Sequence, residues 1–182
     1  WMERFKNAAP QIEIVNSSEG IADMDDPHVW TSPRNAKTMI ANIAGALIRA
    51  NSSDSAYFAH RRDSMMLRMD ALDRQFASIT APHRGKAFLI YHPTLTYLAH
   101  DYCLRQIVVE NDGKEPSAKE LKEIIAQAKT ANVKTILLQK EFAEHSVTAL
   151  AGETGAEIKE INPLAYDWAT EINSIINKIC NR

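Results

Sequence analysis

Hydrophobic residues follow a helical spacing through the first half of the chain. From Pro33 to about Asn51 they recur every three or four positions, which predicts one amphipathic helix. A second helical run lies within residues 53–82 and has a heptad-like seam, made of Phe58, Met65, Met69, Leu72, Phe76 and Ile79. At about 1.5 Å per residue this helix would extend roughly 40 Å, so we expect it to act as a spine between two lobes.

After Gly85 short apolar runs alternate with amphipathic runs. Strands are predicted at residues 87–91, 106–110, 135–138 and 157–161, and helices at residues 94–103, 117–130, 143–153 and 167–180. The first strand is almost entirely apolar, as expected when helices cover both faces of a sheet. Four strand–helix units with short connections predict a parallel sheet flanked by helices, and hence an α/β fold.

The start of the chain predicts a short helix over residues 1–9, which Pro10 ends, and a short strand within residues 11–16. The chain begins at Trp1, inside a helical run, and no signal-peptide pattern opens it. We therefore expect a fragment or a processed chain, from which any targeting segment has been removed. No apolar run approaches the roughly 20 residues that span a bilayer.

Composition and charge narrow the function classes. The 182 residues are 45% hydrophobic, enough for one core or two small lobes. The net charge of −2 provides no basic field for nucleic acid or an anionic membrane surface, so neither is favoured as a partner. Two cysteines, Cys103 and Cys180, are too few for a disulfide scaffold or a zinc knuckle, and either one disulfide or two separate thiols fits the sequence.

Two histidines lie in positions where proline restricts the backbone. Pro27 fixes its own φ and restricts the residue before it, so His28 lies in a constrained loop just before the first long helix. His92 precedes Pro93 at the carboxyl end of a predicted strand, where ligands bind in open parallel sheets. Two such histidines on either side of a spine helix would suit a transition metal, although His92 fits equally well as an ordinary histidine at a strand end.

Other polar residues give weaker signals. The strand-end rule also selects residues 110–112, Gln139 and Asn162. The acidic loop before His28 is expected to be a solvated turn. The remaining histidines are expected at the surface: His60, His83, His100 and His145. The sequence has no nucleophile elbow, no His-Glu-x-x-His and no glycine-rich phosphate loop, so no catalytic residue is predicted.

Several segments in order resemble one family, the metal-specific substrate-binding proteins of ABC importers that take up zinc or manganese. The shared segments are Asp-Pro-His-Val-Trp-Thr-Ser-Pro at 26–33, Tyr-His-Pro at 91–93 with Leu-Thr-Tyr-Leu at 95–98, residues 110–123 around Gly-Lys-Glu-Pro-Ser at 113–117, Glu-Thr-Gly-Ala at 153–156, and Asn-Pro-Leu at 162–164. The resemblance covers essentially the whole chain. It implies a two-lobed receptor that binds one divalent metal between its lobes and delivers it to a membrane permease, without catalysing a reaction.

The resemblance also implies an organisation. Residues 1–52 would be a remnant of the N-terminal lobe, residues 53–82 the linking helix, and residues 83–182 the C-terminal lobe. The protein would be periplasmic, or extracytoplasmic and membrane-anchored. The family's first histidine ligand lies earlier than the start of this chain. We therefore expect an incomplete N-lobe, weak or no specific zinc binding by this chain alone, and an exposed sheet edge through which an oligomer could form.

The implied ligands are His28 from the N-lobe, His92 from the C-lobe, and Asn162 at the position where many members carry an aspartate. An amide oxygen is a weaker donor than a carboxylate, so the site would favour zinc, with manganese as the alternative. Two other functions stay open. One is a small metal-dependent hydrolase with His92 as ligand or base, and the other is a metal-free structural or adhesive relative with a vestigial site.

Overall fold

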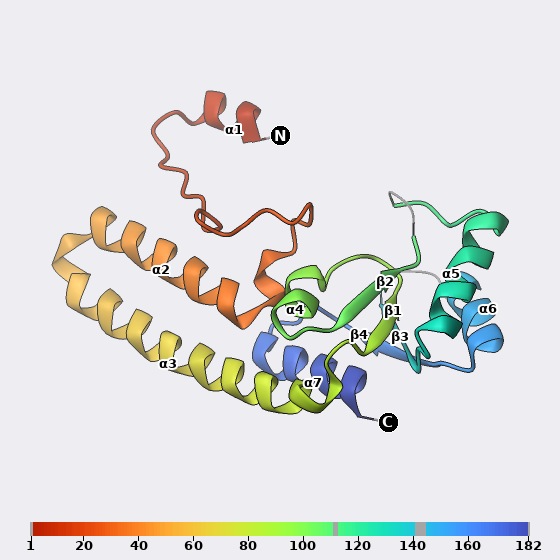
Figure 1. The fold of residues 1–182 in the computed structure, drawn as a ribbon. Helices are drawn as coiled ribbons and strands as arrows, with labels where there is room; N and C mark the ends of the chain where they lie inside the picture. The colour runs from red at the N-terminus through yellow and green to blue at the C-terminus, as the bar shows by residue number, and fades with distance from the viewer. Residues whose placement is uncertain (1, 111–112, 141–144, 182) are drawn as a thin grey trace.

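The centre of the molecule is a four-stranded parallel sheet with the order β2-β1-β3-β4 (Figure 1). The computed structural model describes residues 2–110, 113–140 and 145–181. The strands are β1 (Ala87–Ile90), β2 (Arg105–Val108), β3 (Thr135–Gln139) and β4 (Glu157–Ile161). Every strand predicted after Gly85 is therefore confirmed, with small differences at the ends.

A helix follows each strand. These helices are α4 (Thr96–Asp101), α5 (Ala118–Thr130), α6 (His145–Thr154) and α7 (Trp168–Cys180). Helices α4 and α7 cover one face of the sheet, whereas α5 and α6 cover the other (Figure 1). Helix α5 begins with a capping box, in which Ser117 and Glu120 bond each other's backbone N–H. The α/β class with a parallel sheet between helical layers is thus confirmed.

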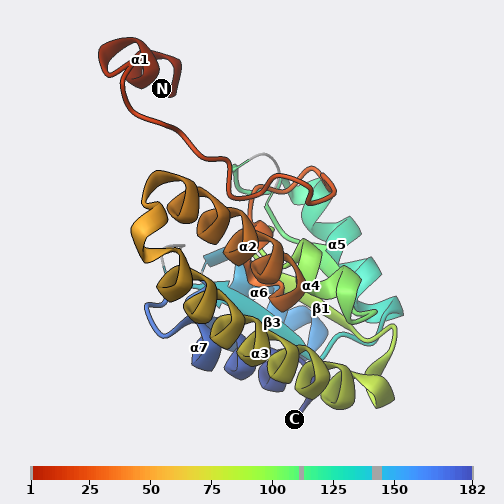
Figure 2. The ribbon, with the colours of Figure 1, turned by 90° about the vertical axis from the view of Figure 1, so that its left-hand side faces the viewer.

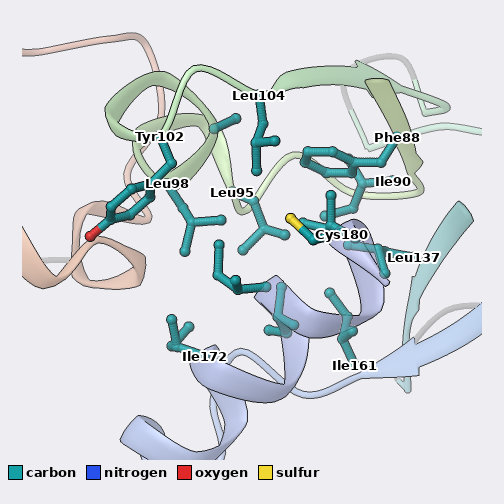
Figure 3. Packing of buried hydrophobic residues seen from close by; sticks show 14 of the residues in the cluster. Phe88, Ile90, Leu95, Leu98, Tyr102, Leu104, Leu137, Ile161, Ile172 and Cys180 are labelled. Carbon is teal, nitrogen blue, oxygen red and sulfur yellow. The ribbon is translucent and has the colours of Figure 1, made fainter. Parts of the chain in front are cut away.

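The larger hydrophobic core lies between the sheet, α4 and α7 (Figure 3). Helix α7 contributes four isoleucines that are fully buried: Ile172, Ile175, Ile176 and Ile179. Each such burial stabilises the fold by about 1.5–3 kcal/mol. Cys180 extends this cluster, and neither it nor Cys103 forms a disulfide, so the alternative of two separate thiols is the correct one. Burial raises the pKa of the Cys180 thiol, although Lys86 opposes the shift.

Two long helices form a hairpin that projects from the sheet (Figures 1 and 2). They are α2 (Pro33–Ala50) and α3 (Ser55–Thr80), joined by the short 3-10 helix η2 (Ser52–Asp54). Ser32 caps α2 through its hydroxyl, and Pro33 is the first helical residue, as predicted. Only the C-terminal part of α3 joins the main core, where Phe76 is fully buried. The predicted spine helix is therefore present, with 26 residues.

The N-terminal segment contains only helix α1 (Met2–Ala8) as regular structure, and α1 stands apart from the rest of the chain (Figure 2). The predicted strand within residues 11–16 is wrong. Ile12 and Ile14 in this stretch are exposed, and no strand in the described part of the chain pairs with them. A strand needs a neighbour for its backbone hydrogen bonds, and alternation of side chains alone does not supply one.

None of the helices within the described residues has the length and apolar content that crossing a bilayer requires.

Candidate metal-binding site

His28 is held in place by the carboxylate two residues before it. Asp26 Oδ1 accepts hydrogen bonds from the His28 backbone N–H (2.8 Å) and from His28 Nδ1 (2.6 Å). Because an ionised carboxylate only accepts, Nδ1 carries the proton and Nε2 keeps its lone pair in the neutral ring. Asp26 is only 7% exposed, so the sequence-based expectation of a solvated acidic turn is wrong at this residue. The Asp-x-His spacing in the sequence could have identified Asp26 as a partner of His28.

His92 has the same kind of support from a distant part of the chain. It lies beyond the end of β1, and its Nδ1 bonds Glu110 Oε1 at 2.7 Å. Glu110 follows β2, the neighbour of β1 in the sheet, and its side chain is buried. A carboxylate on one ring nitrogen is the usual outer support of a metal-bound histidine, because it fixes the tautomer and the ring orientation.

The imidazole rings of His28 and His92 lie close together in an edge-to-face arrangement. Their centroids lie 5.1 Å apart and their planes make an angle of 88°. With Zn–N bonds of about 2.0–2.1 Å and tetrahedral angles, two rings on one zinc would have centroids about 5.2 Å apart. An edge-to-face aromatic contact has a similar spacing, but it does not require a carboxylate behind each ring. The carboxylates on both Nδ1 atoms therefore favour a shared metal at the Nε2 side.

A pocket of about 250 Å³ lies beside the two rings. Its lining comes from four separate segments: His28 and Trp30, His92 and Thr94, Gln139, and Pro163 and Leu164. The indole N–H of Trp30 donates to the Pro163 carbonyl at 3.3 Å, which closes one side of the pocket. Apolar walls exclude water and strengthen electrostatic attraction for a cation bound between the rings.

The loop that carries His28 is fastened to the α/β part of the molecule. The Met24 backbone N–H donates to the Tyr97 hydroxyl at 3.2 Å, and the Ser32 hydroxyl donates to the Asp101 carboxylate. Both acceptors belong to α4. These bonds, with that of Trp30, hold His28 at a fixed distance from His92.

The charge of the site favours a cation. Asp26 Oδ2 and Glu110 Oε2 are both buried without a hydrogen-bond partner among the described residues. Two buried carboxylates behind neutral imidazoles leave negative charge that a bound cation would offset. Burial is the main cause that raises the pKa of the nearby Tyr91 phenol, and the negative charges of Glu115 and Glu110 raise it further.

Asn162 takes a different position from that of the two histidines. It follows β4 directly, and its Oδ1 accepts a hydrogen bond from the Leu164 backbone N–H at 3.1 Å. The backbone N–H of Asn162 donates to Glu171 Oε1 at 2.9 Å. Asn162 is not among the described residues that line the pocket, although Pro163 and Leu164 are. The structure thus brings His28 and His92 together, and a ligand role for Asn162 stays a prediction.

Within residues 2–110, 113–140 and 145–181, no three His, Cys, Asp or Glu side chains form a metal-ligating cluster. The candidate site consists of two imidazoles and the two carboxylates that support them. Residues 111 and 112, which the strand-end rule selects, lie outside the described residues.

The structure combines a parallel α/β unit with a long helical hairpin and brings two histidines close together, which is the arrangement that the resemblance to metal-specific substrate-binding proteins implies. The chain belongs to the family described as zinc-uptake complex component A, periplasmic (ZnuA), whose family model matches residues 1–176. The family that the sequence motifs resemble is thereby confirmed.

Individual relatives agree with this assignment. The high-affinity zinc uptake system protein ZnuA of Bacillus subtilis (strain 168) is 27% identical over 173 residues, which are 88% of this chain and 54% of that protein. A crystal structure of ZnuA is 32% identical with a TM-score of 0.93, and a ZnuA deletion mutant with zinc bound is 30% identical with a TM-score of 0.92. Both cover 100% of this chain, which covers 73% of each. The chain spans about half the length of the curated relative.

Proposed function

We propose that this chain carries part of the metal site of an ABC-importer substrate-binding protein, with His28 and His92 as ligands of one divalent ion. The observation that supports this most is the paired imidazoles, 5.1 Å apart, each with a carboxylate on Nδ1. The carboxylates on Nδ1 fix the orientation of both rings, so metal binding would require little reordering of either ring.

We propose zinc as the cargo, with manganese as the alternative. Two imidazole nitrogens suit zinc, whereas manganese prefers oxygen ligands. The relatives named for zinc uptake, and the ZnuA mutant solved with zinc, support the same choice. Asn162 is a secondary candidate, because it does not line the pocket beside the two rings and its Oδ1 already accepts one hydrogen bond from the Leu164 N–H.

Binding without catalysis is the function that the arrangement favours. A metal-dependent hydrolase would need a general base beside the metal. The Asp26 and Glu110 carboxylates lie on the Nδ1 side of the rings, away from the Nε2 atoms that would bind the metal, so neither is placed to activate metal-bound water.

The whole protein would act outside the cytoplasm, as the periplasmic family description suggests, and would deliver its metal to a membrane permease. We keep the proposed division into residues 1–52, 53–82 and 83–182, because helix α3 (Ser55–Thr80) lies within the middle range.

Calorimetric titration of zinc into metal-free protein tests the assignment. His92→Ala should weaken zinc binding by at least about tenfold, because one of two protein ligands is lost. His60→Ala is the matched control, since His60 is exposed on α3 and should leave the titration unchanged. An unaltered zinc affinity in His92→Ala would show that His92 is not a ligand.

A further inference from the structure

The side-chain amide of Gln139 holds the main chain of His92 on both sides. Gln139 is the last residue of β3 and is 2% exposed. Its Oε1 accepts a hydrogen bond from the His92 N–H (3.3 Å), and its Nε2 donates to the His92 carbonyl (2.6 Å). Nε2 also donates to the Thr94 hydroxyl at 3.1 Å. One buried amide therefore holds residues 92–94.

The hydrogen bonds between Gln139 and His92 lie one residue beyond the backbone hydrogen bonds of Tyr91 to the neighbouring strands. The last ladder bonds run from the Tyr91 N–H to the Leu137 carbonyl and from the Glu110 N–H to the Tyr91 carbonyl, each 3.1 Å long. One residue later, at His92, the side chain of Gln139 bonds both main-chain groups. Pro93 has no N–H of its own, so this turn depends on side chains for its order.

We propose that Gln139 is a positioning residue for the metal site, which fixes the backbone of His92 while Glu110 fixes the rotation of its ring. This inference rests on the proposed function. Both polar atoms of the Gln139 amide bond the main chain of His92, so we assign Gln139 a role that acts through His92. With the main chain and Nδ1 both held, the direction of His92 Nε2 is determined.

The chain offers a matched control in Gln106. Gln106 Oε1 accepts from the Leu95 N–H and its Nε2 donates to the Thr96 hydroxyl, both at 3.1 Å. It supports the start of α4 with the same chemistry, but these bonds do not involve His92. Loss of a general structural contact should therefore affect Gln106→Met and Gln139→Met alike, whereas loss of positioning should affect only Gln139→Met.

The test compares both variants with the wild type in zinc competition against a fluorescent chelator and in the visible spectrum of the cobalt-loaded protein. We expect Gln139→Met to bind zinc about 10- to 100-fold more weakly, as for other outer-shell partners, and to change the cobalt spectrum. Gln106→Met should keep both wild-type values. Wild-type zinc affinity together with a wild-type cobalt spectrum in Gln139→Met would overturn the inference.

A second measurement does not depend on metal. Amide hydrogen exchange at His92 in the metal-free protein should be faster in Gln139→Met and unchanged in Gln106→Met. If this chain alone binds no zinc, the ligand assignment has to be tested in the whole protein, and this exchange rate alone decides whether Gln139 holds His92; equal rates would overturn the inference. If Gln139→Met does not fold, Thr94→Val replaces it, because it removes one partner of the same amide. An unchanged exchange rate at His92 in Thr94→Val would then count against the inference.

Discussion

Tyr102 is predicted to stabilise the fold in a way that disappears at high pH. It lies at the end of α4, is 3% exposed, and its hydroxyl donates to Asp73 Oδ1 at 2.9 Å. Arg34 Nε bonds the same Asp73 oxygen at 2.8 Å, and the Arg34 guanidinium lies 5.3 Å from the centre of the Tyr102 ring. Burial, followed by the bond to Asp73, raises the pKa of the Tyr102 phenol well above its ordinary value.

The magnitude follows from these contacts. Tyr102→Phe removes a hydrogen bond to a carboxylate, which is expected to cost about 1.5 kcal/mol at pH 8. Above about pH 10 the phenol ionises in the unfolded chain but stays protonated in the folded one, so the unfolded state is favoured as the pH rises. For one proton at pH 11 this amounts to about 1.4 kcal/mol. The stability advantage of wild type over Tyr102→Phe should therefore nearly vanish at pH 11.

Urea unfolding of wild type and Tyr102→Phe at pH 8, 10 and 11, monitored by circular dichroism, measures the difference between their free energies of unfolding. Comparing wild type with variant cancels the titration of the other groups. Tyr57→Phe, which removes a phenol that is 62% exposed, is the matched control and should stay within about 0.5 kcal/mol of wild type at pH 8. A difference between wild type and Tyr102→Phe that stays the same from pH 8 to pH 11 would refute the reasoning.

Two further substitutions test the site and the core. Asp26→Ala should weaken zinc binding about 10- to 100-fold in calorimetry, because His28 loses the acceptor of its Nδ1 proton. Glu19→Ala removes an exposed acid from the same loop and should have little effect, whereas an equal loss in both variants would indicate a general charge effect. Phe76→Ala should lower the free energy of unfolding by about 3–5 kcal/mol, since Phe76 is fully buried where α3 meets the main core. Leu67→Ala, on the exposed face of the same helix, should stay within about 0.5 kcal/mol of wild type, and a similar small effect for Phe76→Ala would contradict the described packing.

The sheet and its helices were predictable because their signals are local. Apolar runs marked the strands, and apolar residues at helical spacing marked α2 and α3. The strand within residues 11–16 was not predictable in the same way. Its alternating pattern is local, but a strand forms only beside a partner, and the described residues provide none there.

The site was predictable only in part. The prolines and the strand-end rule identified His28 and His92, and Asp26 is close enough in sequence to have been recognised as a partner. Glu110 and Gln139 lie 18 and 47 residues from His92, so their roles emerge only once the strand order places β2 and β3 beside β1. The sequence likewise does not show that the Asn162 side chain bonds its own loop.

The most direct test of the central claim is a crystal structure of the zinc-soaked protein with anomalous data at the zinc absorption edge. The account predicts one strong anomalous peak between the two rings, about 2.0–2.1 Å from Nε2 of both His28 and His92. A peak bound by only one of these histidines, or zinc located only elsewhere on the protein, would contradict the account.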